Sequence, residues 1–411
     1  MNIVYFSHYF SPEIGAPSAR IYDLSRCWLS TDDQVEVVTC FPNHPHGKVY
    51  SDYQVKKYEY EKLDGIDVHR NWSYITPNKG FIKKTLGHVS MWASSRLFSF
   101  RKLKQPEIII GTSPTFFAAM AGLRAAAHHN VPFVMEVRDL WPAIFVELGV
   151  LTNKTIISLL ERWELWMYRR ATKIVTVTEA FRQDLIQRGI PADKVHTIPN
   201  GADTTYWLPK PKPAELADKL QLQDKFVVLY IGTHGISQAL HSVVTAASML
   251  NDQPDIHFLF VGAGADKQKL INQSEELKLK NITFHDPVTK AEMNDFYALS
   301  DLCLIPLRDI PLFDTFIPSK MFEVMAMERP IIGSLRGESA EILMNSGSSI
   351  VVEPEDSQAL AKAIQEVYKL PRNERMELGK NGRKFVDAHY SRMALSKTYK
   401  NVLKEAIQEY K

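Results

Sequence analysis

Lys320 and Glu323 combine a cation and a carboxylate at a spacing that could bind a diphosphate and a sugar hydroxyl. An apolar run at residues 302–307 predicts a strand, and a proline-containing loop follows it. Pro318 and Ser319 are suited to open a helix, because proline is tolerated in the first turn. Glu323 lies one turn after Ser319, on the same face, and a helix start favours phosphate through its amides and dipole. We therefore expect an anion site here.

The same pair also has a simpler interpretation. Lys320 and Glu323 are three residues apart on the predicted helix, so they could form a solvated ion pair of small energetic value. The preceding strand and the unusually long loop favour a functional site over this alternative.

Three glycine-containing turns follow predicted strands, where backbone amides can approach a ligand closely. Gly15, in the run FSPEIGAPSAR, follows the first strand and precedes a predicted helix. In the second half, residues 232–235 (GTHG) and 262–264 (GAG) each end a strand. Each turn could hold a phosphate or nucleotide, or could reflect tight turn chemistry alone. The first turn lacks the full dinucleotide-binding fingerprint.

Two pairs of polar residues end strands of the first half. Arg138 and Asp139, in the run EVRDLW, follow one strand, and Asp139 could orient a sugar hydroxyl or take a proton. Asp139 could equally cap the next turn or pair with Arg138. Thr178 and Glu179 begin a helix after another strand, where helix capping is the simpler account.

The sequence does not predict a metal site or a cofactor. The loop PNHPHG carries His44 and His46, but no acidic residue or cysteine lies nearby at ligand spacing. The chain also has no Asp-x-Asp pair of the kind that holds Mg²⁺ or Mn²⁺ on a diphosphate. Cationic side chains and helix amides would have to take that role.

The composition is that of a globular protein. Of 411 residues, 45% are hydrophobic and 23% charged, and we expect two domains. The net charge of +2 argues against nucleic acid as a partner. Cys27, Cys40 and Cys303 lack paired spacings and are expected to be reduced residues of a cytoplasmic protein. The first residues indicate a strand rather than a signal peptide, and no uncharged apolar run reaches about 18 residues, so no membrane span is expected.

Apolar runs alternate with helical patterns in both halves, which predicts an α/β fold of two doubly wound, Rossmann-like domains. The predicted domains are residues 1–203 and 204–390, facing across a cleft, with a proline-rich linker at 199–213. A last helix at 391–411 could pack on either domain. The predicted strands lie near residues 3–7, 35–39, 108–110, 133–137, 174–177, 195–198, 227–231, 257–261, 282–284, 302–305, 331–333 and 350–352.

Residues 81–104 could lie on an anionic membrane surface. The segment mixes aromatic and aliphatic residues with basic ones and contains no acid. An ordinary helix with a basic outer face is the alternative. The basic residues are Lys83, Lys84, Arg96, Arg101, Lys102 and Lys104.

Taken together, these features resemble the family 4 glycosyltransferases, whose members have the two-domain GT-B fold. The resemblance spans almost the whole chain and is carried by IPNGAD at 198–203, VGAG at 261–264, FEVMA at 322–326 and GESAEI at 337–342. The segments GAPSAR, PNHPHG, RDLWP, GTHG and PSKMFE are most similar to an O-antigen and capsule branch that includes proteins identified as N-acetyl-L-fucosamine transferases.

The resemblance implies a retaining transfer of a sugar from a nucleotide diphosphate donor, without a metal. It implies that Glu323, the second glutamate of the family's E-x7-E motif, binds the donor ribose. The first glutamate of that motif falls at Thr315, which is a departure, and Asp314 or backbone amides could substitute.

A second departure concerns the diphosphate. The family's Arg and Lys after the first strand of the second domain fall at Thr233 and Gln238. We expect Lys320 and Arg308 to replace their charge.

The predicted enzyme transfers a sugar, N-acetyl-L-fucosamine or another N-acetylated hexose, from a UDP-sugar to a polyprenyl-diphosphate-linked glycan at the inner face of the bacterial cell membrane. A sugar-nucleotide epimerase and a non-catalytic nucleotide-sugar-binding module are the alternatives. The predicted catalytic residues are Asp139, Lys320 and Glu323. The predicted substrate-binding residues are Gly15, Arg20, Arg138, Thr178, Glu179, Asn200, Gly232, Thr233, His234, Gly235, Gln238, Gly262, Gly264, Val288, Arg308 and Ser319.

Overall fold

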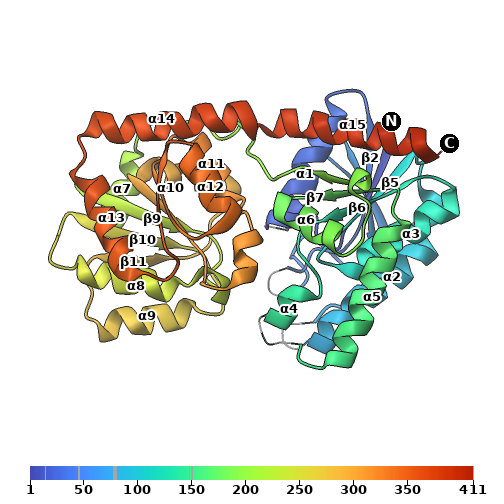
Figure 1. Cartoon of the computed structure of the whole chain (residues 1–411), viewed down its shortest axis with the longest axis horizontal. Helices are drawn as coiled ribbons and strands as arrows, with labels where there is room; N and C mark the ends of the chain where they lie inside the picture. Colours follow the sequence, from blue (N-terminus) through green and yellow to red (C-terminus); the bar gives the residue numbers. More distant parts are fainter. Residues whose placement is uncertain (14, 45–46, 77–80, 148, 150, 411) are drawn as a thin grey trace. The chain divides into compact units, whose positions relative to one another are not determined.

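The computed structural model describes residues 1–13, 15–44, 47–76, 81–147, 149 and 151–410. The chain forms two compact units, Met1–Pro199 with Arg392–Lys411, and Asn200–Ser391 (Figure 1). The division after Pro199 lies slightly before residue 203, where the sequence analysis placed the boundary. Each unit is a parallel or mostly parallel sheet covered by helices, which confirms the predicted fold class.

The first unit contains an eight-stranded sheet in the order β3-β4-β2-β1-β5-β6-β7-β8. Its central strands are buried along most of their length, which explains why they are continuous apolar runs in the sequence. The chain leaves β1 toward β2 on one side and later returns to β5 on the other, so a topological switch point lies beside β1. The strands are β1 (Asn2–Phe6), β2 (Gln34–Cys40), β3 (Tyr58–Leu63), β4 (Ile66–Asn71), β5 (Ile108–Thr112), β6 (Phe133–Val137), β7 (Lys173–Thr176) and β8 (Val195–Thr197).

The hairpin of β3 and β4 was absent from the predicted strands. These strands are antiparallel to each other and form the edge of the sheet, with an alternating polar pattern rather than an apolar run. Asp64 and Gly65 form the turn with positive φ values of 49° and 91°. An Asp-Gly pair between two alternating segments is the usual signal of such a hairpin, so the sequence did carry the information.

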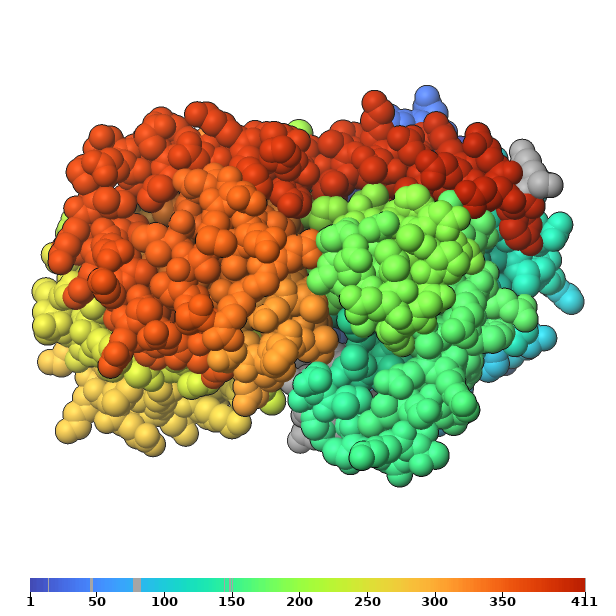
Figure 2. All heavy atoms as spheres, in the orientation of Figure 1, coloured from blue at the N-terminus to red at the C-terminus, as the bar shows by residue number. Residues whose placement is uncertain are grey.

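The helix that ends the chain, α15 (Arg392–Tyr410), packs on the first unit. The Trp28 indole donates a hydrogen bond to the Ser396 carbonyl at 3.1 Å and meets the Tyr399 ring edge to face at 5.4 Å. Figure 2 shows the red C-terminal segment lying along the green surface formed near residues 180–200. The other helices of this unit are α1 (Ala16–Leu29), α2 (Phe81–Phe98), η1 (Phe100–Lys102), α3 (Phe116–His129), α4 (Ala143–Glu147), α5 (Lys154–Arg170), α6 (Glu179–Gln187) and η2 (Ala192–Lys194).

The second unit contains a sheet of six parallel strands in the order β11-β10-β9-β12-β13-β14. The strands are β9 (Phe226–Ile231), β10 (Ile256–Val261), β11 (Ile282–His285), β12 (Leu302–Pro306), β13 (Ile331–Ser334) and β14 (Ser349–Val352). The helices are α7 (Ala214–Leu220), η3 (Ile236–Gln238), α8 (Leu240–Met249), α9 (Lys267–Glu276), α10 (Lys290–Leu299), η4 (Pro311–Thr315), α11 (Lys320–Ala326), α12 (Gly337–Asn345), α13 (Ser357–Lys369) and α14 (Arg372–His389).

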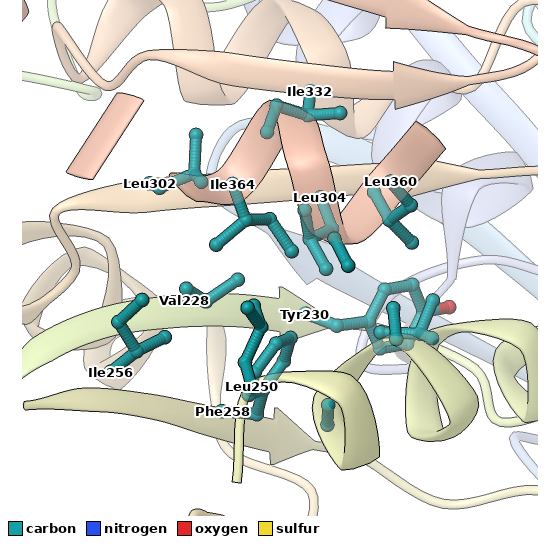
Figure 3. Packing of buried hydrophobic residues seen from close by; sticks show 14 of the residues in the cluster. Val228, Tyr230, Leu250, Ile256, Phe258, Leu302, Leu304, Ile332, Leu360 and Ile364 are labelled. Atoms are coloured by element: carbon teal, nitrogen blue, oxygen red, sulfur yellow. The ribbon is translucent and has the colours of Figure 1, made fainter. Parts of the chain in front are cut away.

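An apolar core holds the strands of the second unit against α8 and α13. Figure 3 shows Val228, Phe258 and Leu302 from the sheet packed with Leu360 and Ile364 from α13. Each of these side chains is at most 1% exposed. Because close-packed interiors resist displacement, this core fixes where the carboxyl ends of β9, β10 and β12 lie.

Candidate functional site

The turns that follow β9 and β10 are packed directly against each other. The Gly232 amide donates to the Val261 carbonyl at 2.9 Å, and the His234 amide donates to the Ala263 carbonyl at 2.9 Å. A Cβ atom on Gly262 would lie 1.9 Å from the Gly232 carbonyl oxygen, and one on Gly264 would lie 2.1 Å from the His234 carbonyl oxygen. The tertiary contact therefore requires glycine at both positions, with or without a ligand.

Lys320 meets this pair of turns from α11. Its ammonium donates to the Ile231 carbonyl at 2.9 Å and lies 4.1 Å from the centre of the Tyr230 ring. A Cβ atom on Gly232 would lie 2.6 Å from the same ammonium. The structure thus brings together Lys320 and Gly232, which are 88 residues apart in the chain (320 minus 232).

The buried position of Lys320 lowers the pKa of its ammonium group. Burial lowers the pKa of Lys320 to about 8, although the nearby Glu323 carboxylate and Cys303 act to raise it. A partly desolvated ammonium gains strongly from a second anion, because its charge is poorly screened by water. The site is therefore suited to a phosphate group.

Glu323 lies next to Lys320 on α11 and is half-buried. The Tyr297 hydroxyl donates to Glu323 Oε2 at 3.2 Å, which orients the carboxylate. Tyr297, like Tyr230, was not among the predicted site residues, because an isolated tyrosine within an apolar pattern indicates a residue of the hydrophobic core.

Two of the first-turn amides of this helix are engaged within the turn. Helix α11 has only seven residues, and the Met321 and Phe322 amides donate to the Pro318 and Ser319 carbonyls at 3.1 and 3.3 Å. Ser319 has helical backbone angles and makes no side-chain cap. The Lys320 ammonium is therefore a better candidate donor for an anion than the Met321 and Phe322 amides.

His234 is also misplaced by the sequence analysis. Its side chain is fully buried, with ring contacts to Tyr230 and Phe260, so it is a core residue. Burial, together with the charges of Lys267 and Lys320, lowers its pKa to about 4.

The remaining predicted residues of this unit surround the turns. Thr233 is exposed, Val288 is half-buried in the loop after β11, and Gln238 is half-buried with its Oε1 3.1 Å from a Cβ position on Gly235. Arg308 is exposed, and its amide donates to the Ser237 carbonyl at 3.0 Å. It lines a cavity of about 360 Å³ with Leu240, His241, Asp266, Lys269 and Gln273.

Thr315, at the position of the expected first glutamate, lies in η4. Its hydroxyl donates to the Leu312 carbonyl at 2.6 Å, so the side chain serves the local turn. The neighbouring Asp314 is half-buried, and burial raises the pKa of its carboxyl. A Cβ atom on Gly337 would lie 1.9 Å from the Asp314 carbonyl oxygen, which fixes the η4 backbone against α12.

In the first unit, Arg138 and Asp139 follow β6 at the carboxyl edge of the sheet. The Arg138 amide donates to Ser113 Oγ at 2.8 Å, and the Asp139 amide donates to the same oxygen at 3.3 Å. Burial raises the pKa of Asp139 to about 6, although the Arg138 charge acts to lower it. Ser113, which follows β5, is a positioning residue that the sequence analysis missed.

Arg20 is not available to a substrate, contrary to the prediction. Its side chain is 2% exposed, and its Nε donates to Glu136 Oε2 at 2.9 Å. Its two terminal nitrogens donate to the Ile198 and Pro199 carbonyls, each at 2.9 Å. Arg20 therefore holds the end of the first unit against β6.

Thr178 and Glu179 follow the simpler interpretation of helix capping and local pairing. Thr178 Oγ1 accepts a hydrogen bond from the Phe181 amide at 3.0 Å. Glu179 accepts bonds from Arg182, Gln183 and Thr197 at 2.7 to 2.9 Å. These contacts give both residues structural roles.

The predicted substrate-binding roles of Gly15 and Asn200 stay predictions. Gly15 has extended backbone, and a Cβ atom there would meet only Pro17 Cδ at 3.7 Å, so the fold itself does not require glycine. Asn200 is buried at the start of the second unit.

In the segment predicted to lie on a membrane surface, residues 81–104, two of the six basic side chains have partners within the fold. Lys102 Nζ lies 3.5 Å from the centre of the Tyr58 ring, and Lys104 pairs with Asp67 at 2.7 Å. All six basic residues of the segment are exposed, and Leu86 and Leu97 are exposed beside them. In the part of the chain that the structure describes, no helix is long and apolar enough to cross a membrane.

Within the described ranges, no group of three or more His, Cys, Asp or Glu side chains is arranged to hold a metal ion. His46 of the predicted histidine pair lies outside the described residues.

Two family models together cover most of the chain. Residues 15–201 match the "Glycosyl transferase 4-like domain", and residues 212–385 match "Glycosyl transferases group 1". The chain is a GT-B glycosyltransferase. The transferase is 24% identical over 384 residues to WcaI of Escherichia coli, a glycosyl transferase named for colanic acid biosynthesis, covering 91% of this chain and 93% of WcaI.

Solved structures share the fold of the transferase. Sucrose-phosphate synthase from Thermosynechococcus elongatus superposes with a TM-score of 0.78 at 16% identity, covering 99% of each chain. HepE from Anabaena, solved in complex with UDP-glucose, superposes with a TM-score of 0.73 at 15% identity, covering 98% of this chain and 100% of HepE.

Proposed function

We propose that this transferase moves a sugar from a UDP-sugar to a glycan linked to polyprenyl diphosphate, with retention of the anomeric configuration and without a metal. The proposed donor sugar is N-acetyl-L-fucosamine or another N-acetylated hexose, and the proposed product is an O-antigen or capsular polysaccharide. The observation that carries the proposal is the Lys320 ammonium, held beside the Gly232 turn with a lowered pKa. Such a cation can stabilise a leaving diphosphate where a metal ion would otherwise do so.

Two relatives support the choice of substrates. HepE was solved with UDP-glucose, which favours a uridine nucleotide as donor. WcaI is named for the synthesis of colanic acid, which favours a polysaccharide product. The lipid link is proposed because α2 and η1 present basic and apolar residues together.

The proposed reaction occurs on one face of the donor sugar. The bond between the anomeric carbon and the diphosphate oxygen breaks, and the acceptor hydroxyl oxygen forms the new bond from the same side. The hydroxyl proton passes to the departing diphosphate oxygen. Lys320 stabilises that diphosphate, Glu323 holds the donor ribose, and Asp139 orients the sugar or the acceptor.

The test is a panel of UDP-, GDP- and dTDP-sugars with a polyprenyl-diphosphate glycan, assayed for release of nucleotide diphosphate with and without EDTA. We expect release that requires the acceptor and survives EDTA, and an NMR coupling constant in the product that reports retention. Donor consumption without acceptor would instead indicate an epimerase or hydrolase. Donor binding without turnover would indicate a binding module.

Lys320→Met should lower the turnover of the best donor on the order of 100-fold, because the leaving charge loses its stabilising cation. Lys362→Met is the matched control, since Lys362 is an exposed lysine on α13 of the same unit. Turnover of Lys320→Met within a few-fold of wild type would reject Lys320 as the replacement for the family's cations.

A further inference from the structure

Arg138 carries a buried guanidinium, two of whose nitrogens have no hydrogen-bond partner among the described residues. The residue is 8% exposed, and among the described residues neither Nε nor Nη1 has a hydrogen-bond partner. Buried cations are normally paired, because removing a charge from water is costly. An unpaired one in a native fold therefore needs an explanation.

Glu136, the acid with the larger electrostatic effect on Arg138, is already engaged by other groups. Its two carboxylate oxygens accept bonds from Arg20 Nε at 2.9 Å, Tyr5 Oη at 2.5 Å and Thr112 Oγ1 at 3.1 Å. Arg20 and Glu136 thus form a closed pair, and Arg138 lies near two carboxylates, Glu136 and Asp139, whose charges act to raise its pKa against the effect of burial. Among the described residues neither carboxylate bonds Arg138 Nε or Nη1, so these two donors are available to an oxyanion supplied from outside the chain.

Arg138 is also rigidly placed at the edge where parallel sheets bind ligands. It directly follows β6, and Ser113, which follows β5, bonds its amide at 2.8 Å. The Ser113 amide in turn donates to the Glu136 carbonyl at 2.9 Å, which ties the two strand ends together. β5 and β6 lie next to the switch point beside β1, where ligands of doubly wound sheets usually bind.

We propose that Arg138 is the receptor for an oxyanion on the acceptor, either the diphosphate of its lipid link or a carboxylate of an acidic sugar. This inference rests on the proposed function, since it names the chemistry of the acceptor that the first unit recognises. Guanidinium groups are well suited to both oxyanions.

The stability of two variants separates this role from a structural one. Arg138→Met removes an unpaired buried charge, so the melting temperature should stay unchanged or rise. Arg20→Met breaks a closed buried pair, so the melting temperature should fall clearly. A fall for Arg138→Met as large as that for Arg20→Met would overturn the proposal, because Arg138 would then be paired within the fold.

The kinetic test uses three acceptors with one donor. They are a neutral glycan on polyprenyl diphosphate, the same glycan on a neutral alkyl chain, and a uronic-acid glycan on the neutral chain. Arg138→Met should raise KM on the order of tenfold for one of the two anionic acceptors, with little change for the neutral one or for the donor. Arg138→Lys should recover part of the loss, since it keeps the charge.

The response identifies the source of the oxyanion. An effect confined to the first acceptor assigns the lipid diphosphate, and one confined to the third assigns a sugar carboxylate. Equal effects on all three acceptors, or an effect on donor KM alone, would overturn the proposal. If wild type used none of the acceptors, the proposed function itself would fail, and the melting data would still judge the unpaired state of Arg138.

Discussion

At the scale of single residues, Lys320 depends on a balance between burial and nearby charge. Burial favours the neutral amine, while Glu323 and Cys303 favour the ammonium, and burial is the larger effect. Among the described residues, the ammonium contacts the Ile231 carbonyl and the face of the Tyr230 ring. An arriving diphosphate would neutralise it.

Because the pKa of Lys320 is lowered to about 8, we expect kcat/KM for the donor to fall as pH rises through about 8. Below that pH the side chain is charged and attracts the diphosphate, and above it the side chain is neutral. Steady-state kinetics at low donor concentration from pH 6 to 10 would measure this fall, which is the alkaline limb of the pH profile. Lys320→Arg should move the limb to higher pH, and an unchanged limb in that variant would assign it to another group.

The close packing of the turns at residues 232–235 and 262–264 should make glycine essential for stability at position 262. Gly262→Ala should lower the free energy of unfolding by roughly 2–4 kcal/mol, because its Cβ atom would collide with the Gly232 carbonyl at a φ of 145°. Gly235→Ala is the matched control in the adjacent turn, where φ is −124° and the added atom meets the side chains of Gln238 and Thr233 but no backbone atom. Urea denaturation compares the two, and equal losses would contradict the packing argument.

At the scale of elements, α15 belongs to the core of the first unit although it ends the chain. Tyr399, Leu403 and Ala406 are fully buried and join the same cluster as Trp28 and the strands of the first sheet. Lys400 adds an ion pair with Asp33 at 2.5 Å. The first unit is therefore assembled from segments at both ends of the sequence.

Leu403→Ala should destabilise the first unit by about 2–5 kcal/mol, because it leaves a cavity under α15. Met393→Ala on the same helix should change stability by less than about 0.5 kcal/mol, since Met393 is 53% exposed. Urea denaturation followed by circular dichroism measures the free energy of unfolding of both variants. Similar effects of the two substitutions would mean that α15 does not contribute to the core.

At the scale of the whole molecule, both units present their candidate chemistry after the carboxyl ends of parallel strands. Lys320, Gly232 and Gly262 do so in the second unit, and Arg138 and Asp139 do so in the first. This arrangement assigns the donor to one unit and the acceptor to the other under the proposed function.

The proposed membrane contact is also a property of the whole protein. Changing Lys83, Lys84, Arg96 and Arg101 together to Glu should release it from vesicles containing anionic lipid, since each cation contributes about 1 kcal/mol near such a surface. The control changes four exposed cations of the second unit, Lys362, Lys369, Arg372 and Lys384. Vesicle cosedimentation measures both, and equal loss of binding would show only a dependence on net charge.

The sequence by itself determined the α/β class, because buried parallel strands must be apolar and such runs are visible without the structure. It also identified Lys320, Glu323 and Arg138 as residues able to do chemistry, since charges after strand ends are rarely explained by packing. It did not separate these from Arg20, His234 and Thr178, whose types fit a site equally well.

Only the tertiary structure decided which side chains are free. Arg20 and Arg138 lie beside the same glutamate, yet one is fully bonded and the other has N–H groups without partners among the described residues. Lys320 reaches Gly232 because β9 and β12 are neighbours in the sheet, not because of their spacing in the chain. Hydrogen-bond satisfaction and burial depend on contacts between distant segments, and residue type alone cannot specify them.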